Sequence, residues 1–370
     1  MRITLLGAGH IGQTITRLLH GSGDYAVTVV DRSAEALAKI SADPACAGVK
    51  TLVAETADAA SVLAVLRGQD TVVNALPYHL ATIAATAARE AGVHYFDLTE
   101  DVAATRAIQQ LAAGAKTAFM PQCGLAPGFI GIVAHHLAQG FDALHDVKMR
   151  VGALPAFPTN ALKYNLTWSV DGLINEYCHP CEAIRDGHRI EALPLEGLEH
   201  FSLDGIEYEA FNTSGGLGTL CETLAGRVRN LDYKSVRYPG HHALMKVLLE
   251  ELRLADDQET LKTIMRRAIP STMQDVVLVF VTVSGTRKGQ LVQEVFARKI
   301  FAERAQDGAE AQSAIQITTA AGVCAAVDLF RTGRLPQRGF VRQEQVALPE
   351  FLANRFGRAY QQFRQVESIG

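Results

Sequence analysis

Three glycines lie within six residues near the start of the chain, in the sequence GAGHIG. In this spacing the first glycine permits a tight turn, the second lets backbone approach a pyrophosphate, and the third lets a helix pack closely on a strand. The following helix would direct free N–H groups and its positive dipole end at the phosphates. The pattern predicts a dinucleotide site, although the same glycines also suit an ordinary strand-to-helix turn. Its expected members are Gly7, Gly9, His10, Ile11 and Gly12.

An acidic residue supports this interpretation and indicates which dinucleotide binds. Asp31 ends a second apolar stretch, 24 residues after Gly7. A carboxylate at this place accepts hydrogen bonds from the adenosine ribose hydroxyls. It would repel the 2′-phosphate of NADP, whereas the neighbouring Arg32 could attract that phosphate or lie over the adenine ring. We expect NAD as the cofactor, with NADP as the less favoured alternative.

Further candidate residues follow later apolar stretches that predict buried strands. Ligands of an open parallel sheet bind outside the carboxyl ends of its strands. A nicotinamide ring extending from Gly9 across those ends should meet Pro77, with Ala75 and Leu76 beside it, and then Asp97 and Cys123. The competing interpretations are a simple loop at Leu76-Pro77 and a small buried apolar side chain at Cys123.

The order of elements predicts how these residues are positioned. Over residues 1–125, short apolar runs alternate with stretches of helical periodicity, which favours a parallel sheet covered by helices on both faces. Beyond Pro127 the strands lengthen and adjoin, as in Val276 to Ser284 and Leu291 to Phe301, which is typical of antiparallel pairing. We expect an α/β fold with a Rossmann-type doubly wound domain over residues 1–125. A second α+β domain, built on a mainly antiparallel sheet, is expected over residues 126–309 for substrate binding and oligomerisation.

The last part of the chain is expected to return to the first domain. Residues 310–370 predict a helix from Gln312 to Thr332 and a second one near Pro349 to Phe363. Both would lock the two domains together.

Composition limits the partners. The 370 residues are 48% hydrophobic and 20% charged, with a formal net charge of -4, which gives no reason to expect nucleic acid or an anionic membrane as partner. No apolar signal segment precedes the glycine turn, and the longest apolar stretch, Val276 to Val283, is too short to span a bilayer. We expect a cytoplasmic protein that binds small molecules and forms a homo-oligomer, most simply a dimer.

The six cysteines are unevenly spread and resemble reduced thiols more than a disulfide framework. Cys178 and Cys181 have the spacing of half a zinc knuckle, but no second C-x-x-C or H-x₃₋₅-H follows to complete four ligands. We expect no metal, and whether these two cysteines have a role stays open.

Several of these motifs resemble the saccharopine dehydrogenase family. They are GAGHIG at Gly7, NALP at Asn74, YFDLTED at Tyr95 and CGLAPGF at Cys123. Two further stretches, LKYNLTWSVDGLINEY and SVRYPGHHALM, are similar to the shorter members, the lysine 6-dehydrogenases. The resemblance covers nearly the whole chain. It departs at Ala126, where saccharopine reductases typically have the aspartate of CGLDPG, and this departure argues against saccharopine as the substrate.

The resemblance implies NAD(P)-dependent oxidation at a carbon that bears an amine. In a lysine 6-dehydrogenase, hydride leaves the ε-carbon of L-lysine and the imine hydrolyses. The products are ammonia and 2-aminoadipate 6-semialdehyde, which cyclises to piperideine-6-carboxylate. The alternatives are a saccharopine or carboxynorspermidine dehydrogenase of the same family, and a dinucleotide-binding sensor without catalysis.

That chemistry requires a neutral amine, although the reference pKa of the lysine ammonium is about 10.4. We expect Asp97 or Glu100 to attract the ammonium and a nearby tyrosine or histidine to relay its proton. The candidates for the relay are Tyr164 beside Trp168, and His241 with His242. For His241 the competing interpretation is a histidine that merely starts a helix.

The polar end of such a substrate needs its own partners. Arg237 is our candidate for the α-carboxylate, because a guanidinium matches a carboxylate with two parallel hydrogen bonds. A solvated or structural arginine is the alternative. Thr213 and Ser214 precede two glycines and offer hydroxyls with close backbone approach, so we expect them in the substrate site as well.

Overall fold

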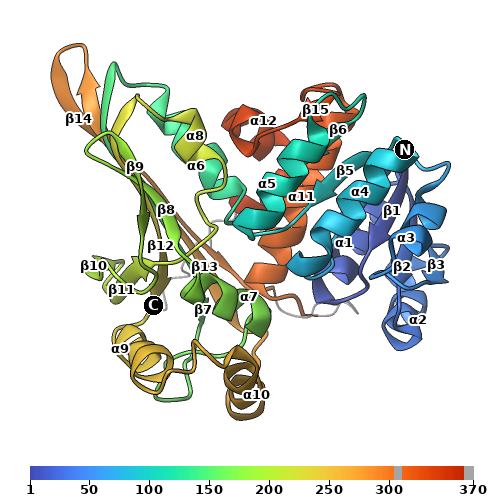
Figure 1. The fold of residues 1–370 in the computed structure, drawn as a ribbon, viewed down its shortest axis with the longest axis horizontal. Helices are drawn as coiled ribbons and strands as arrows, with labels where there is room; N and C mark the ends of the chain where they lie inside the picture. Colours follow the sequence, from blue (N-terminus) through green and yellow to red (C-terminus); the bar gives the residue numbers. More distant parts are fainter. Residues whose placement is uncertain (304–310, 362–370) are drawn as a thin grey trace, which may run out of the picture.

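The computed structural model describes residues 1–303 and 311–361, which form two sheets with helices packed around and between them (Figure 1). The first sheet has seven strands in the order β15-β6-β5-β4-β1-β2-β3, and every pairing in it is parallel. The expected doubly wound parallel sheet is confirmed. Its strands are β1 (Arg2–Leu6), β2 (Ala26–Asp31), β3 (Lys50–Val53), β4 (Thr71–Asn74), β5 (His94–Asp97), β6 (Ala118–Met120) and β15 (Gly339–Phe340).

Helices cover both faces of this sheet because successive side chains of a strand point to opposite faces. In β1, Ile3 and Leu5 join one hydrophobic cluster and Leu6 joins the other. The Leu6 side carries α3, α4 and α5, whereas α1, α2 and α11 lie on the other side. The helices are α1 (His10–Gly21), α2 (Ala34–Ala42), α3 (Ala59–Leu66), α4 (Ala81–Ala91), α5 (Val102–Ala112) and α11 (Ala314–Arg331).

The second sheet is mixed but mainly antiparallel, as expected. Its main path runs β10-β11-β12-β7-β13-β14, with the hairpin β8-β9 attached to β12, and only the β12–β7 pairing is parallel among the described strands. The strands are β7 (Ala143–Pro155), β8 (Cys181–Arg185), β9 (His188–Ala192), β10 (Glu199–Leu203), β11 (Ile206–Asn212), β12 (Val228–Arg237), β13 (Asp275–Arg287) and β14 (Gln290–Phe301).

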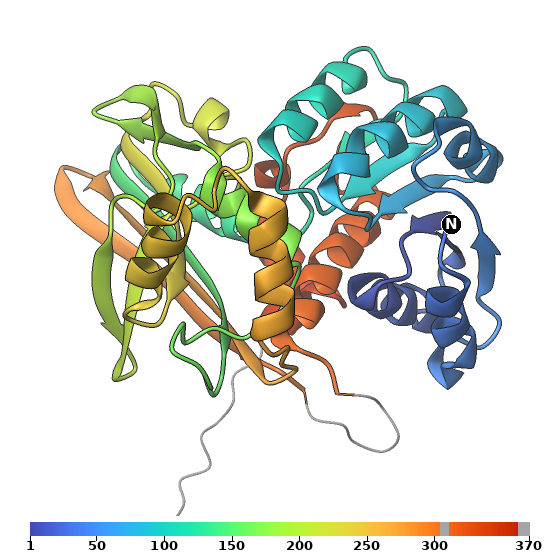
Figure 2. The ribbon, with the colours of Figure 1, turned by 60° about the horizontal axis from the view of Figure 1, so that its bottom comes forward.

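Short helices complete this half of the molecule, and several of them border the space between the two sheets (Figure 2). They are α6 (Phe129–Ala138), α7 (Val170–Cys178), α8 (Leu220–Thr223), α9 (His241–Lys246), which continues as the π-helical turn η3 (Val247–Glu251), and α10 (Gln258–Ala268).

Helix α11 is long and apolar enough to cross a membrane by length and composition, but 83% of it is buried inside the structure. It packs against α1 of the first sheet and against β13 of the second. It is therefore a core helix that joins the two halves of the molecule.

The end of the described chain differs from the single helix expected near Pro349 to Phe363. It forms the 3₁₀ turn η4 (Gln343–Gln345), the helix α12 (Leu348–Ala353) and the turn η5 (Gly357–Gln361). A Cβ on Gly357 would lie 1.8 Å from the carbonyl oxygen of Phe351, so the chain folds back onto α12 instead of continuing it. Residues 362–363 and the expected boundary at residues 309/310 lie outside the described residues.

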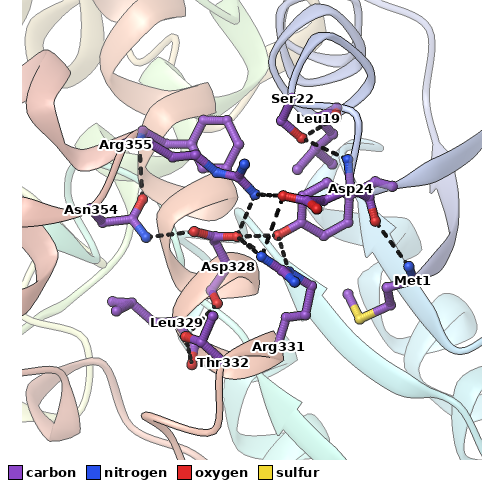
Figure 3. A network of polar contacts seen from close by, with 12 residues as sticks. Met1, Leu19, Ser22, Asp24, Asp328, Leu329, Arg331, Thr332, Asn354 and Arg355 are labelled. Carbon is purple, nitrogen blue, oxygen red and sulfur yellow. Dashed lines mark hydrogen bonds and ion pairs between the residues drawn. The ribbon is translucent and has the colours of Figure 1, made fainter.

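A polar network holds this returning segment against the first domain (Figure 3). The buried carboxylate of Asp328 accepts hydrogen bonds from Tyr25 Oη at 2.6 Å, Asn354 Nδ2 at 2.8 Å and Arg355 Nη2 at 2.8 Å. Arg331 donates to the same carboxylate at 3.2 Å. Burial alone would raise the pKa of Asp328, but these hydrogen bonds hold it below its ordinary value.

Candidate functional site

The glycine turn between β1 and α1 has the geometry of a phosphate cradle. Gly7 has φ +104°, and a Cβ on Gly12 would lie 2.0 Å from the carbonyl oxygen of Gly7, so only glycine fits at both places. No described atom lies within 4 Å of a Cβ built on Gly9. Helix α1 starts at His10 without a side-chain cap, so its first N–H groups are available to an anion. These residues fit a bound dinucleotide.

Asp31 lies beside this turn, as expected for a ribose-binding carboxylate. It accepts hydrogen bonds from the backbone N–H of Ala8 at 2.7 Å and of Ser33 at 2.8 Å. Each carboxylate oxygen keeps a lone pair for a further donor. The side chain of Arg32 is exposed at the same edge.

The expected row of strand ends forms next to the turn, because β1, β4, β5 and β6 are neighbours in the sheet. A Cβ on Gly7 would lie 2.8 Å from the carbonyl oxygen of Ala75. Leu76 N–H donates to the side chain of Asn74 at 3.2 Å, which fixes the start of the loop that contains Pro77. Backbone therefore closes around the glycine turn from the β4 side.

Asp97 and Cys123 meet at the next two strand ends. Asp97 is fully buried and accepts hydrogen bonds from Tyr95 Oη at 2.7 Å, Gln122 N–H at 2.8 Å and Thr99 N–H at 3.0 Å. Burial raises the pKa of Asp97 to about 6. It does not cap α5, because Asp101 accepts the hydrogen bond from Ala104 N–H there.

Cys123 is buried beneath this point and not exposed as a nucleophile. Its backbone N–H donates to the carbonyl oxygen of Asp97 at 2.8 Å, and its thiol donates to the carbonyl oxygen of Met120 at 3.1 Å. Gln343 Nε2 lies 3.2 Å from the sulfur. Burial raises the pKa of the thiol well above its ordinary value, so the sulfur stays protonated.

Arg237 is the buried cation of the second domain. It ends β12 and is 3% exposed, and its Nε donates to Tyr177 Oη at 2.9 Å while Nη1 donates to the carbonyl oxygen of Val236 at 2.8 Å. Its guanidinium carbon lies 5.3 Å from the ring centre of Tyr164. Among the described residues, no side chain or backbone group accepts a hydrogen bond from Nη2, and no carboxylate lies within 4.0 Å of the guanidinium.

His241 is fully buried, and both of its ring nitrogens have protein partners. Its Nδ1 lies 2.9 Å from the carbonyl oxygen of Leu162, so this nitrogen carries the hydrogen, and its Nε2 accepts from Tyr177 Oη at 3.1 Å. Burial, reinforced by Arg237, lowers the pKa of His241 to about 3. We therefore revise its predicted role from proton relay to positioning of Tyr177. The ring of His242 likewise bonds elsewhere, to the carbonyl oxygen of Leu195 at 2.6 Å.

Two carboxyl groups face the same region. In α7, Gly172 and Glu176 are four residues apart and share a face. A Cβ on Gly172 would lie 3.1 Å from Glu100 Oε1 and 2.5 Å from the ring of Trp168, so Glu100 and Trp168 pack on that face. None of the ion pairs among the described residues includes Glu100 or Glu176.

Burial raises the pKa of both carboxyl groups, to about 7 for Glu100 and about 8 for Glu176. Arg237 opposes the increase at Glu176, and the negative charge of Glu100 adds to it. The charge state of Glu176 is therefore coupled to Arg237 and to Glu100.

The remaining predicted substrate residues, Tyr164, Thr213 and Ser214, lie near Arg237, Glu176 and Glu100. Tyr164 is fully buried, and its hydroxyl has no hydrogen-bond partner among the described residues. Thr213 Oγ1 lies 2.8 Å from Ser235 Oγ, and Ser214 donates from its backbone N–H to the carbonyl oxygen of Glu176 at 2.9 Å. A Cβ on Gly215 would lie 2.3 Å from the carbonyl oxygen of Glu100, so this loop packs directly on the strand-end residues of the first domain.

Glu176 and Tyr177 were not among the site residues predicted from the sequence. A signal was present, because Leu173, Ile174 and Tyr177 predict the buried side of a helix, and Glu176 falls among them. An acidic residue on a buried helical face is uncommon unless it is paired or functional.

The described residues contain no group of three or more histidine, cysteine, aspartate or glutamate side chains that could hold a metal ion. Cys181 is buried and Cys178 is partly buried, and both are free thiols.

Two family models together match almost the whole chain. The model described as the saccharopine dehydrogenase NADP binding domain matches residues 3–120, and the saccharopine dehydrogenase C-terminal domain matches residues 124–358. The first match coincides with the parallel sheet up to β6, and the second contains Arg237 and Glu176.

A solved structure shows the same fold, and a second one matches more weakly. Apo saccharopine dehydrogenase (L-Glu forming) from Saccharomyces cerevisiae is similar over 97% of this chain and 96% of its own, with 17% identity and a TM-score of 0.75. A probable dehydrogenase from Thermotoga maritima is similar over 98% of this chain and 96% of its own, with 10% identity and a TM-score of 0.45.

Proposed function

Because the chain belongs to the saccharopine dehydrogenase family of NAD(P)-binding oxidoreductases, we propose that it is an NAD-dependent lysine 6-dehydrogenase. The proposed reaction is oxidative deamination of the ε-amino group of L-lysine. It yields ammonia and 2-aminoadipate 6-semialdehyde, which cyclises to piperideine-6-carboxylate.

The unpaired charges of the site carry this proposal. Arg237 is buried without a carboxylate within ion-pair distance among the described residues, and Glu100 and Glu176 lack a cation at that distance. Arg237 and Glu176 are buried and Glu100 is partly buried, and charges in such places are costly unless a partner or ligand pairs with them. L-Lysine brings one carboxylate for the guanidinium and two ammonium groups for the two glutamates, so its charges complement those of the site.

Saccharopine fits this arrangement less well, because it carries three carboxylates and would require further cations. Two other buried cations of the second sheet, Arg150 and Lys234, are both paired with Glu199 and have no free charge to offer. The electrostatic balance therefore favours a substrate with one carboxylate.

The residues of the chain divide the chemical work between them. NAD, when bound along the glycine turn, supplies the hydride acceptor. Glu100 lies in the loop that follows β5 and, with a pKa near 7, is suited to take the proton from the ε-ammonium at neutral pH. The carboxylate of Asp97 is already occupied by three donors, so we assign it to holding Tyr95, Thr99 and Gln122 around the reacting end.

Tyr164 and Trp168 border the path between the two ends of the substrate and exclude water from it. Arg237, held from behind by Tyr177, receives the α-carboxylate. Water then hydrolyses the imine, and the carbonyl product is released with ammonia.

We propose NAD because the carboxylate of Asp31 lies beside the glycine turn, where it would accept hydrogen bonds from ribose hydroxyls and repel a 2′-phosphate. We also propose that the protein forms a homodimer. Strand β14 is an edge of the second sheet and exposes Leu291 (74%) and Val295 (51%), which a second copy could cover. Light scattering at micromolar concentration tests this, and a monomer mass would contradict it.

A substrate screen tests the proposed function directly. Purified protein is mixed with NAD or NADP and one of L-lysine, saccharopine, carboxynorspermidine, L-ornithine or 1,5-diaminopentane, and absorbance of the reduced nicotinamide is followed. We expect the highest kcat/KM with L-lysine and NAD. A higher value with saccharopine would overturn the proposal, and no reaction with any amine would support a role as a sensor.

A further inference from the structure

We propose that Glu176 binds the α-ammonium group of the substrate and thereby restricts the enzyme to α-amino acids. The inference rests on the proposed function for the identity of the reacting amine, but it concerns the opposite end of the substrate. It assigns to Arg237 and Glu176 together the recognition of an amino-acid head group.

The order of residues along the site separates a reacting end from a binding end. Glu100 follows a strand of the dinucleotide-binding sheet, beside the expected place of the nicotinamide. Arg237 and Glu176 belong to the second domain, on β12 and α7. A substrate with its reacting amine at Glu100 therefore extends its far end toward Arg237 and Glu176.

The α-carbon of an amino acid carries both a carboxylate and an ammonium group. A site that binds both needs a basic and an acidic side chain that lie near each other without forming an ion pair. Arg237 and Glu176 meet this requirement. Arg237 Nε donates to Tyr177 Oη at 2.9 Å, which places the guanidinium beside the residue that follows Glu176 on α7. No ion pair within 4.0 Å joins Arg237 and Glu176 among the described side chains. Tyr177 takes the Nε hydrogen of Arg237 and leaves Nη2 unpaired. A zwitterion between the two side chains would satisfy both.

Glu176 is also held in place by its backbone and not by its carboxylate. Ser214 N–H donates to its carbonyl oxygen at 2.9 Å, while no described residue donates a side-chain hydrogen bond to the carboxylate. Only 6% of the residue is exposed, so most of its surface is covered by neighbouring residues. Burial raises its pKa to about 8 in the free protein, and an arriving ammonium would lower it again.

The test compares L-lysine with 6-aminohexanoate, which keeps the carboxylate and the reacting amine but lacks the α-ammonium. In Glu176→Gln, we expect KM for L-lysine to rise at least about tenfold, the usual effect of losing a hydrogen bond to a charged group. The KM for 6-aminohexanoate should stay within about twofold of the wild-type value. The matched control is Glu191→Gln, the same change at an exposed residue of β9, which should alter neither constant.

An equal rise of KM for both compounds, or no change for L-lysine, would overturn the inference. Thermal unfolding with NAD present separates it from the proposed function, because this measurement needs no turnover. A wild-type protein that never oxidises lysine refutes the proposed function. The inference on Glu176 is then supported if L-lysine raises Tm more than 6-aminohexanoate does and Glu176→Gln abolishes that difference, and refuted if the variant keeps it.

Discussion

At the scale of single residues, burial and hydrogen bonding divide similar carboxyl groups into different roles. Asp97 accepts three hydrogen bonds, whereas Glu176 is buried and Glu100 is partly buried, and neither glutamate has a cation within 4.0 Å among the described side chains. Residue type alone does not distinguish them. The partners that each carboxyl group finds in the fold therefore support our proposal that Asp97 positions its neighbours and that the two glutamates bind a ligand.

Glu100 sets the expected pH dependence. Its pKa of about 7 means that it is mostly protonated at pH 6 and cannot accept a proton, so kcat/KM for L-lysine should rise as pH increases through 7. We expect Glu100→Gln to lower kcat at least about a hundredfold and to remove this rise. The pH profiles of both proteins from pH 5.5 to 9 provide the measurement. A variant that keeps the wild-type profile would show that another group accepts the proton.

The raised pKa of Glu176 predicts a difference in stability between the wild type and Glu176→Gln. The folded-state pKa of Glu176 is raised to about 8 from an ordinary 4.5, so the ligand-free protein loses stability as pH rises from 4.5 to 8, and the loss is constant above 8. Glu176→Gln should therefore melt a few degrees above the wild type at pH 8 and equally at pH 4.5. Calorimetry at the two pH values checks this. If Glu176→Gln were less stable than the wild type at pH 8, the conclusion that the carboxyl group of Glu176 is unpaired would be wrong.

Asp31 determines the expected cofactor preference. Asp31→Ala should weaken NAD binding by about 1–3 kcal/mol, because the ribose hydroxyls lose a charged acceptor. It should also reduce the preference for NAD over NADP. The ratio of kcat/KM for the two cofactors is the readout. Since Asp31 also binds Ala8 and Ser33, Tm is recorded beside it. An unchanged ratio would refute the ribose assignment.

At the scale of elements, the join between β1 and α1 shows how one turn serves both the fold and the cofactor. Gly12 lets α1 approach the backbone of Gly7, whereas Gly9 borders open space. The two glycines have the same residue type and belong to one motif. They serve different purposes, and substitution should separate these purposes.

Gly9→Ala should leave the Tm of the ligand-free protein within about 2 °C of wild type, because a Cβ there meets no described atom within 4 Å. NAD binding should be lost, because the added Cβ would lie where the backbone approaches the pyrophosphate. Gly12→Ala should lower Tm as well, since its Cβ would lie 2.0 Å from a carbonyl oxygen. Calorimetry and NAD titration measure both effects. Equal melting temperatures for the two variants would contradict this division.

At the scale of the whole molecule, α11 and the segment after it decide how the two halves are held. Helix α11 contacts α1 and β13, and the network around Asp328 ties Tyr25 to Arg331, Asn354 and Arg355 (Figure 3). The proposed substrate site includes residues of both halves, and the loop at Gly215 packs on Glu100. The proposed site therefore depends on the contacts of α11 and Asp328 that hold the two halves together.

Asp328→Asn should cost about 1.5–3 kcal/mol of unfolding free energy at pH 7, since two arginines lose a charged acceptor. The pKa of Asp328 is lowered in the folded state, so its contribution is present above the ordinary carboxyl range and disappears as pH falls through the lowered value. Denaturant unfolding at pH 7 and pH 3 measures the difference. The exposed pair Arg253–Asp256 offers a control, and Asp256→Asn should change little. Equal losses in the two variants would contradict a structural network at Asp328.

The sequence by itself determined the class of the fold and the dinucleotide turn, because both depend on local patterns. Apolar periodicity predicts strands and helices, and the spacing of Gly7, Gly9 and Gly12 predicts a turn that only glycine fits. The same local reasoning placed Asp31 beside that turn. The single helix expected after Pro349 was wrong, since the reversal at Gly357 depends on its contact with Phe351.

Only the tertiary structure decided how the substrate residues divide their roles. Arg237, Tyr177 and His241 come from β12, α7 and α9, and their hydrogen-bonded chain leaves the imidazole neutral and one guanidinium nitrogen unpaired. Sequence periodicity describes the environment of a residue within its own element, whereas the charge state of a buried group depends on partners from distant elements. For this reason Glu176 became visible as a candidate site residue only when α7 was packed against Glu100 and Arg237.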